Sequence, residues 1–329
     1  MNTRRKLLIA LGSGALAAPL APFAQQQPAK IARIGFLGTE TASAYLSRVE
    51  ALRAGLRELG YAEGRNIVIE FRWADGNNDR LPELASELVR LKVDVLVTHG
   101  IRGGLAAKRA TTTIPIVVAA AGDAVATGLV ASLARPGGNV TGSTFFALEL
   151  YAKRLELLKE AFPRTRRIAF LVNPDNATVA PAVAASERAA KTLKVELHQV
   201  AVRGPNEFSS AFSAMARNRL EAVSVTEDAI FNVNAKAIAD LAAKHRLLSI
   251  GGRDVAEAGG LMGYGANLPE LFRRAAYFVD KILKGAKPGD LPVERPTTFE
   301  FIINRKTAKA LGVAIPQSIL LRADRVIDP

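Results

Sequence analysis

The sequence predicts an α/β protein made of two similar halves, each with a mostly parallel sheet flanked by helices. Short apolar runs alternate with amphipathic stretches throughout the chain after residue 30, a pattern typical of successive strand–helix–strand units. The pattern starts again after Gly142, so we place the break between the halves near Ser143–Thr144. With 329 residues, 49% of them hydrophobic, the chain is long enough to form two compact lobes.

The first half is expected to hold strands joined by helices and short loops. Apolar residues recur every three or four positions over 49–59 and 81–91, which predicts two amphipathic helices, and Gly60 is suited to cap the first of them. A further helix is expected directly after Gly122-Asp123, ending at Pro136. The predicted strands cover residues 31–37, 67–71, 93–98, 114–118 and 140–142.

The second half repeats this organisation. One helix face is marked by Leu148, Tyr151, Leu155, Leu158 and Phe162. Strands are expected over residues 168–172, 195–200, 222–226 and 247–250, followed by a helix over 268–283 and a strand over 299–303. Because this late helix and strand return the chain, it is expected to cross between lobes more than once. Lobe 1 is assigned residues 31–143 plus about 266–288, and lobe 2 residues 144–265 plus about 289–329.

The first residues have the pattern of an export signal. Arg4, Arg5 and Lys6 precede an apolar stretch over 7–20, and Ala-Pro-Phe-Ala at 21–24 supplies small residues at a cleavage position, so residues 1–24 are predicted to be a signal peptide. The apolar stretch is shorter than the roughly 20 residues of a spanning helix, which disfavours an anchor. A twin-arginine and an ordinary Sec signal both fit. The chain contains no cysteine. We therefore expect a periplasmic protein without a lipid anchor or disulfides.

Charge and motifs exclude several function classes. The formal charge is +13, or +10 once Arg4, Arg5 and Lys6 are removed, but aromatic residues make up only 6% and no basic cluster carries them. We therefore expect no nucleic-acid partner. The chain is expected to be a monomer. Nucleophile-elbow, P-loop, dinucleotide-binding and H-E-x-x-H motifs do not occur. With three scattered histidines and no cysteine, we expect neither an enzyme nor a metal or other cofactor.

Candidate binding residues follow the predicted strands, because ligands of open α/β sheets bind beyond the carboxyl ends of the strands. These loops are short, polar and rich in glycine, which suits holding a small polar molecule. His99 either contacts a ligand or packs in its loop. Asp123 and Asp228 either cap helices or pair with a ligand ammonium group. Arg253 binds a carboxylate or a neighbouring acidic residue, and Tyr264 packs or contacts ligand.

Several segments together carry a resemblance to a known family. They include RPGGNVTG at 135–142, DAIF at 228–231 and EAGGLMGYG at 257–265, with further segments at 60–67, 114–117, 122–130 and 173–174. Over residues 31–329 the chain resembles the substrate-binding proteins of ABC importers in the family associated with tryptophan and tyrosine uptake. Where that family commonly has proline after Gly-Asp, this chain has Ala124.

The resemblance implies a two-lobed type I periplasmic-binding-protein fold that closes about a hinge onto its ligand, without enzymatic activity. It implies a solute-binding component that captures an amino acid or related carboxylate and delivers it to a membrane permease. The alternative is a periplasmic sensing module that signals to a membrane partner. Carried over by position, the candidate cleft residues are Thr39, Thr98, His99, Asp123, Thr144, Asn173, Asp228 and Arg253.

Overall fold

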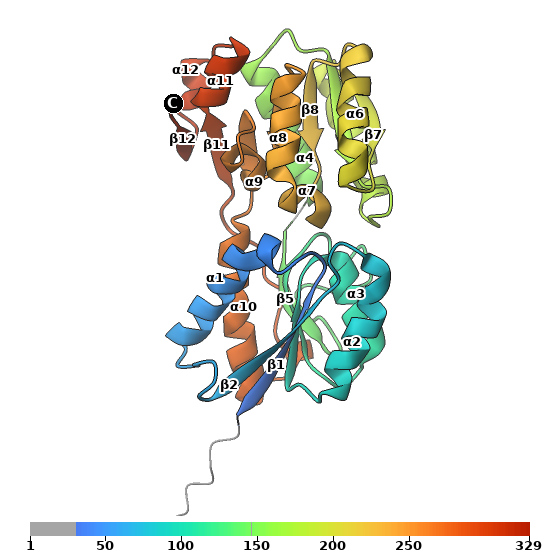
Figure 1. The fold of residues 1–329 in the computed structure, drawn as a ribbon, viewed down its shortest axis with the longest axis vertical. Helices are drawn as coiled ribbons and strands as arrows, with labels where there is room; N and C mark the ends of the chain where they lie inside the picture. Colours follow the sequence, from blue (N-terminus) through green and yellow to red (C-terminus); the bar gives the residue numbers. More distant parts are fainter. Residues whose placement is uncertain (1–30, 146) are drawn as a thin grey trace, which may run out of the picture. The chain divides into compact units, whose positions relative to one another are not determined.

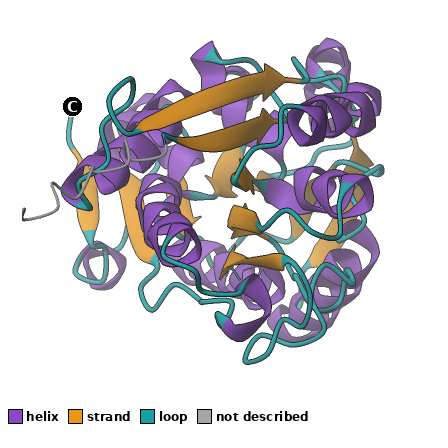
Figure 2. Cartoon of the chain, turned by 90° about the horizontal axis from the view of Figure 1, so that it is seen from below, coloured by secondary structure: helices purple, strands orange, loops and turns teal. Residues whose placement is uncertain are grey.

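Two sheets organise the residues that the computed structural model describes, 31–145 and 147–329 (Figure 1). Helices lie outside the strands in the view of Figure 2. This α/β architecture, with helices around two largely parallel sheets, confirms the predicted fold class. The predicted signal peptide, residues 1–24, lies outside the described residues. No helix in the described ranges is long and apolar enough to cross a membrane.

The first sheet has the strand order β2-β1-β3-β4-β5, with all neighbours parallel. Strands are β1 (Ala32–Gly38), β2 (Ile67–Trp73), β3 (Val95–Thr98), β4 (Ile116–Ala121) and β5 (Val140–Thr144). In Figure 1, α1 (Leu46–Glu58) and α10 (Leu268–Leu283) cover one face, and α2 (Leu81–Arg90) and α3 (Gly100–Ala110) the other. Within β1, Ile34 and Phe36 join one apolar cluster and Leu37 the opposite one, as the alternation of a strand buried on both faces requires.

The second sheet has the order β12-β11-β10-β9-β8-β6-β7, in which only β10 and β11 pair antiparallel. Its strands are β6 (Arg167–Val172), β7 (Glu196–Ala201), β8 (Ala222–Val225), β9 (Leu248–Gly251), β10 (Met262–Gly265), β11 (Glu300–Asn304) and β12 (Arg325–Ile327). Its helices are α4 (Ala147–Ala161), α5 (Val179–Leu193), α6 (Pro205–Arg217), α7 (Ala229–Val233), α8 (Ala235–Lys244), α9 (Arg253–Glu257), α11 (Arg305–Leu311) and α12 (Gln317–Leu320). Short 3-10 helices are η1 (Ser43–Tyr45), η2 (Asn78–Arg80) and η3 (Pro288–Asp290). The strands predicted from the sequence do not include β10 and β12.

Helix α10 shows how a late segment returns to the first sheet. The Asn267 side chain accepts a hydrogen bond from the Glu270 amide and caps the helix, and Leu271, Phe272 and neighbouring apolar residues are buried along one face. Gly55 of α1 lets the two helices approach closely, since a Cβ there would stand 2.5 Å from the Arg273 carbonyl oxygen. The predicted span of this helix, 268–283, agrees with the structure.

The prediction of a helix after Gly122-Asp123 is wrong, because residues 123–139 form a loop that contains several turns. Asp123 Oδ1 accepts from the amides of Val125 (3.1 Å) and Ala126 (2.9 Å), which makes a turn at the start of the loop. Gly128 then takes a left-handed backbone conformation (φ +70°), which stops any helical continuation. Ala124, Leu129 and Val130 nevertheless pack in the core, so the apolar periodicity there reflects loop burial.

Candidate ligand-binding pocket between the two sheets

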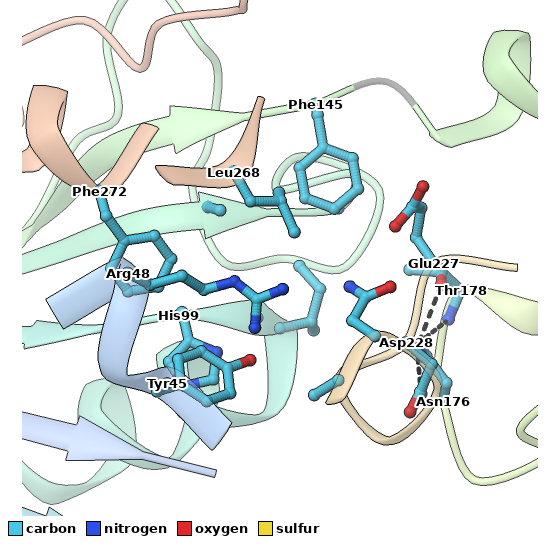
Figure 3. Close-up of a pocket in the computed structure, with 16 residues that line it drawn as sticks. Tyr45, Arg48, His99, Phe145, Asn176, Thr178, Glu227, Asp228, Leu268 and Phe272 are labelled. Carbon is cyan, nitrogen blue, oxygen red and sulfur yellow. Dashed lines mark hydrogen bonds between the residues drawn. The ribbon is translucent and has the colours of Figure 1, made fainter. Parts of the chain in front are cut away.

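The carboxyl ends of strands from both sheets meet at one pocket (Figure 3). Residues after β3 and β4 line it from the first sheet, and residues after β6 and β8 line it from the second. Its empty volume is about 560 Å³, open solvent included. Pockets that hold small ligands fall in this size range and commonly lie at such strand ends.

The first-sheet side of the pocket is largely aromatic. The rings of Tyr45 and His99 stack with centroids 4.2 Å apart, and Phe272 lies 5.8 Å from His99 and 6.0 Å from Tyr45. Phe145 and Leu268 line another part of the wall, as Figure 3 shows. These rings offer a ligand flat apolar surfaces for stacking.

His99 is held neutral in this wall. Its Nε2 atom accepts a hydrogen bond of 3.3 Å from the Thr39 amide, and the side chain is buried. Burial, together with the positive charge of Arg48, lowers the pKa of His99 to about 3. Burial also raises the pKa of Tyr45 to about 12. Both rings are therefore uncharged near neutral pH.

The second-sheet side presents amides and carboxylates. Asp228 caps α7 through Oδ1, which accepts from the Ile230 amide at 2.9 Å. Its Oδ2 atom accepts from the Nδ2 atoms of Asn173 (3.2 Å) and Asn176 (3.0 Å). Asp228 is thus a helix cap that also lines the pocket, so the two roles considered from the sequence are compatible.

Glu227 lines the pocket in a position set by a buried arginine. Arg154 of α4 is fully buried and hydrogen-bonds through its guanidinium to Glu227. The same group donates to the carbonyls of Tyr264 (2.8 Å) and Val225 (3.0 Å). This network ties α4 to the ends of β8 and β10 and so orients Glu227.

An ion pair links the two sheets beside the pocket. Arg48 of α1 pairs with Asp254 of α9, and its guanidinium lies 4.7 Å from the centroid of the Tyr45 ring. The side chains are 7% and 21% exposed, so the pair is largely shielded from solvent. Burial raises the pKa of Asp254, and the positive charge of Arg48 opposes that shift.

The structure brings only part of the predicted site together. His99 and Asp228 line the pocket, Thr39 lines an adjoining compartment, and Asn173 supports Asp228. Arg253 lies beside Asp254 in a neighbouring recess, where it pairs with Glu257 and Glu300. Their contacts with a ligand stay predictions.

Four more predicted residues, besides Thr39, Asn173 and Arg253, stand outside the pocket lining. The Thr98 hydroxyl donates to the Leu37 carbonyl at 2.8 Å, and the Thr144 hydroxyl donates to the Gly122 carbonyl. Asp123 forms its turn, and Tyr264 packs against Phe299 and Phe301. For these side chains the structure shows local hydrogen bonding or packing.

Sequence reasoning missed much of the wall. Asn176 and Glu227 lie in or next to strand-end loops that the sequence did identify, so the whole of each loop is the better unit of prediction. Tyr45, Arg48 and Phe272 come from η1, α1 and α10, whose helical pattern explains them as core residues. Within residues 31–145 and 147–329, no group of three His, Asp or Glu side chains is placed to hold a metal ion.

The fold and the pocket define a two-lobed α/β protein with a pocket between its two sheets. Residues 39–327 match the model of the ABC transporter substrate binding protein family, and the chain belongs to that family. Its fold is the type I periplasmic-binding-protein fold, and its family is one of solute-binding proteins.

Relatives agree with this assignment. The chain is 29% identical over 260 residues to a tyrosine-binding protein of Clostridioides difficile, covering 78% of this chain and 74% of the relative. A domain from Streptococcus pneumonia, solved in complex with L-Trp, superposes with a TM-score of 0.83 at 26% identity, covering 90% of this chain and 99% of the other. The ligand-free, open structure of an adhesive substrate-binding protein from Clostridium difficile gives 0.66 at 25% identity, covering 91% and 99%.

Proposed function

We propose that this chain captures an aromatic amino acid between its two sheets as the solute-binding component of an ABC importer. The observation that best supports this proposal is the composition of the pocket. The aromatic rings of Tyr45, His99 and Phe272 line its first-sheet side, and the polar groups of Asn176 and Asp228 line its second-sheet side. An aromatic side chain fits the first surface and a polar head group the second. Tyrosine and L-Trp, named for two relatives, have both parts.

The apolar area that the ligand's aromatic side chain would bury in the pocket supplies part of the expected binding free energy. An aromatic side chain buries about 150–250 Å², which corresponds to roughly 4–6 kcal/mol at about 25 cal/mol per Å². Micromolar binding needs about 8 kcal/mol. Hydrogen bonds and charge interactions of the head group at the second-sheet side are therefore required to reach it.

Closure about a hinge is part of the proposal. The ion pair between Arg48 and Asp254 joins the two sheets and requires their ends to be close together. At similar identity and coverage, the structure superposes better on the L-Trp complex than on the open, ligand-free relative. Both observations support a closed form that a ligand stabilises by bridging the sheets and that a permease recognises. We also propose export to the periplasm through the leader at residues 1–24.

Isothermal titration calorimetry on the purified protein tests the ligand class. We expect L-tryptophan or L-tyrosine to bind with micromolar affinity, and L-leucine and 3,4-dihydroxybenzoate to bind more weakly. Binding should reduce the radius of gyration in small-angle scattering. Phe145→Ala, which removes a ring from the pocket, should weaken binding about tenfold or more, since such a loss corresponds to about 1.4 kcal/mol.

Phe162→Ala is the matched control, because Phe162 is half-buried and lies outside the pocket lining. It should leave the affinity unchanged. The proposal is wrong if neither aromatic amino acid binds at millimolar concentration. It also fails if Phe145→Ala and Phe162→Ala bind as tightly as the parent protein.

A further inference from the structure

A second compartment adjoins the aromatic pocket and is lined by polar and charged side chains together with Ile101, Ala229 and Ile230. The second compartment has an empty volume of about 370 Å³, open solvent included, and shares five lining residues with the first: Gly100, Ile101, Asn176, Asp228 and Ala229. Glu40, which follows β1, and Arg102 of α3 line it from the first sheet. The compartment therefore adjoins the proposed ligand position, and its lining differs in having charged side chains from the first sheet in place of aromatic rings.

Glu40 is a buried acceptor without a donor. Its side chain belongs to a residue only 7% exposed, and Oε1 makes no hydrogen bond within the described part of the chain. Buried carboxylate oxygens are costly to leave unpaired, and native structures normally satisfy them. Nη2 of Arg102, in the same compartment, is likewise buried without an acceptor. The compartment thus offers an unused acceptor and an unused donor to a ligand.

The charged and titratable groups around Glu40 come from four elements. Asp228 reaches it from the turn after β8, Asp75 from the loop after β2, Arg102 from α3 and Tyr45 from η1. Burial disfavours the ionised form of Glu40 most, the negative charges of Asp228 and Asp75 add to this effect, and the positive charge of Arg102 opposes it.

We propose that Glu40 receives the ammonium group of the ligand, and that binding of an amine releases a proton from Glu40 to solvent. The Glu40 O–H bond breaks and its proton enters the solvent, while the ligand keeps its three N–H bonds and donates one hydrogen bond to the new carboxylate. This inference rests on the proposed function, the binding of an aromatic amino acid, and further specifies that the ligand carries a positively charged ammonium group.

The acid strength of Glu40 fits this role. Burial, with a further contribution from the negative charge of Asp228, raises its pKa to about 7, so about half of the molecules are protonated at neutral pH. An ammonium group at hydrogen-bond distance favours the carboxylate and lowers the pKa again. His99, the other titratable ring nearby, has a pKa of about 3 and stays neutral throughout this range.

Calorimetry at pH 6, 7 and 8 in buffers of different ionisation enthalpy measures both affinity and proton release. The probes are L-tyrosine and L-tryptophan with their analogues lacking the amino group, 3-(4-hydroxyphenyl)propanoate and indole-3-propanoate. For the amino acids we expect an affinity about tenfold higher at pH 8 than at pH 6, because the ionised fraction of a group with a pKa near 7 rises about tenfold. About half a proton should leave per ligand at pH 7.

Glu40→Gln should abolish the pH dependence and the proton release, and reduce the preference for each amino acid over its analogue about tenfold. Glu83→Gln, on the exposed side of α2, is the matched control and should change neither. Should Glu40→Gln fail to fold, proton release by the parent protein still decides the question.

Tight binding of an amino acid with equal affinity at pH 6 and 8 and no released proton overturns the assignment of Glu40. A Glu40→Gln variant that keeps the full preference for the amino acid overturns it too. These outcomes leave the aromatic pocket intact. If neither the amino acids nor their analogues bind, the proposed function itself fails, so the two failures are distinguishable.

Discussion

Replacing Arg154 by leucine removes a cation from the interior of the second lobe. Arg154 is fully buried, and its guanidinium donates hydrogen bonds to the Glu227 carboxylate and to two backbone carbonyls. Leucine keeps apolar volume but supplies no donor. The Glu227 side chain, only 9% exposed, then loses its positive partner, and the carbonyls of Tyr264 and Val225 lose their donors.

The expected cost is large because a buried charge is left unpaired. Removing one partner of a buried ion pair typically destabilises a protein by about 3–5 kcal/mol. For a domain of this size that corresponds to a fall in melting temperature on the order of 10 °C. Urea unfolding followed by circular dichroism, together with calorimetric melting, measures both quantities.

Two further variants test the reasoning. Arg154→Leu combined with Glu227→Leu removes both charges and should be more stable than Arg154→Leu alone. Arg322→Leu is the matched control, since Arg322 pairs with Glu160 at the surface, where the side chains are 44% and 45% exposed. It should cost less than about 1 kcal/mol. A loss below about 1 kcal/mol for Arg154→Leu, or a double variant weaker than the single one, would refute the argument.

Two further predictions concern the first lobe. Gly38→Ala should destabilise the protein by about 1–3 kcal/mol, because a Cβ at Gly38 would overlap the Trp73 ring; urea unfolding followed by the fluorescence of Trp73, the single tryptophan, reports it, and equal stability of Gly38→Ala and the control Gly204→Ala, which meets open space, contradicts it. Because of His99, the free energy of unfolding should fall as the pH drops below about 6.5. Below this pH the unfolded chain binds a proton at His99, whereas the folded protein does not, since its His99 has a pKa of about 3. Between about pH 6.5 and 5 the loss is about 2 kcal/mol. His99→Gln should remove this part of the pH dependence in urea titrations, and an unchanged slope would show that His99 does not cause it.

Local features of the sequence predicted much of the fold. The span predicted for helix α10 agrees with the structure because its signals are local: Asn267 caps it, a proline lies in its first turn, and its apolar residues are spaced three or four apart. Strands buried on both faces, such as β1 and β6, show as continuous apolar runs. Strand β12 has only three residues, none fully buried, so it carries no such signal.

Prediction from the sequence failed where contacts between distant residues decide which structure a local pattern of residues adopts. Ala124, Leu129 and Val130 have apolar spacing suited to a helix, yet they are buried from a loop that Gly128 turns. Asp123 and Asp228 follow strands in similar ways in the sequence, but only Asp228 lines the pocket.

The sequence by itself determined the α/β class, the two halves, most of the strands and the set of loops in which polar groups gather. These properties depend on residues a few positions apart, whose periodicity and caps are visible in one chain. Only the tertiary structure decided which of those loops meet, and which helix residues join them. Arg48 and Asp254 lie 206 positions apart, and Tyr45 and Phe272 are similarly distant, so their proximity follows from how the sheets and helices pack. The pocket is a property of that packing.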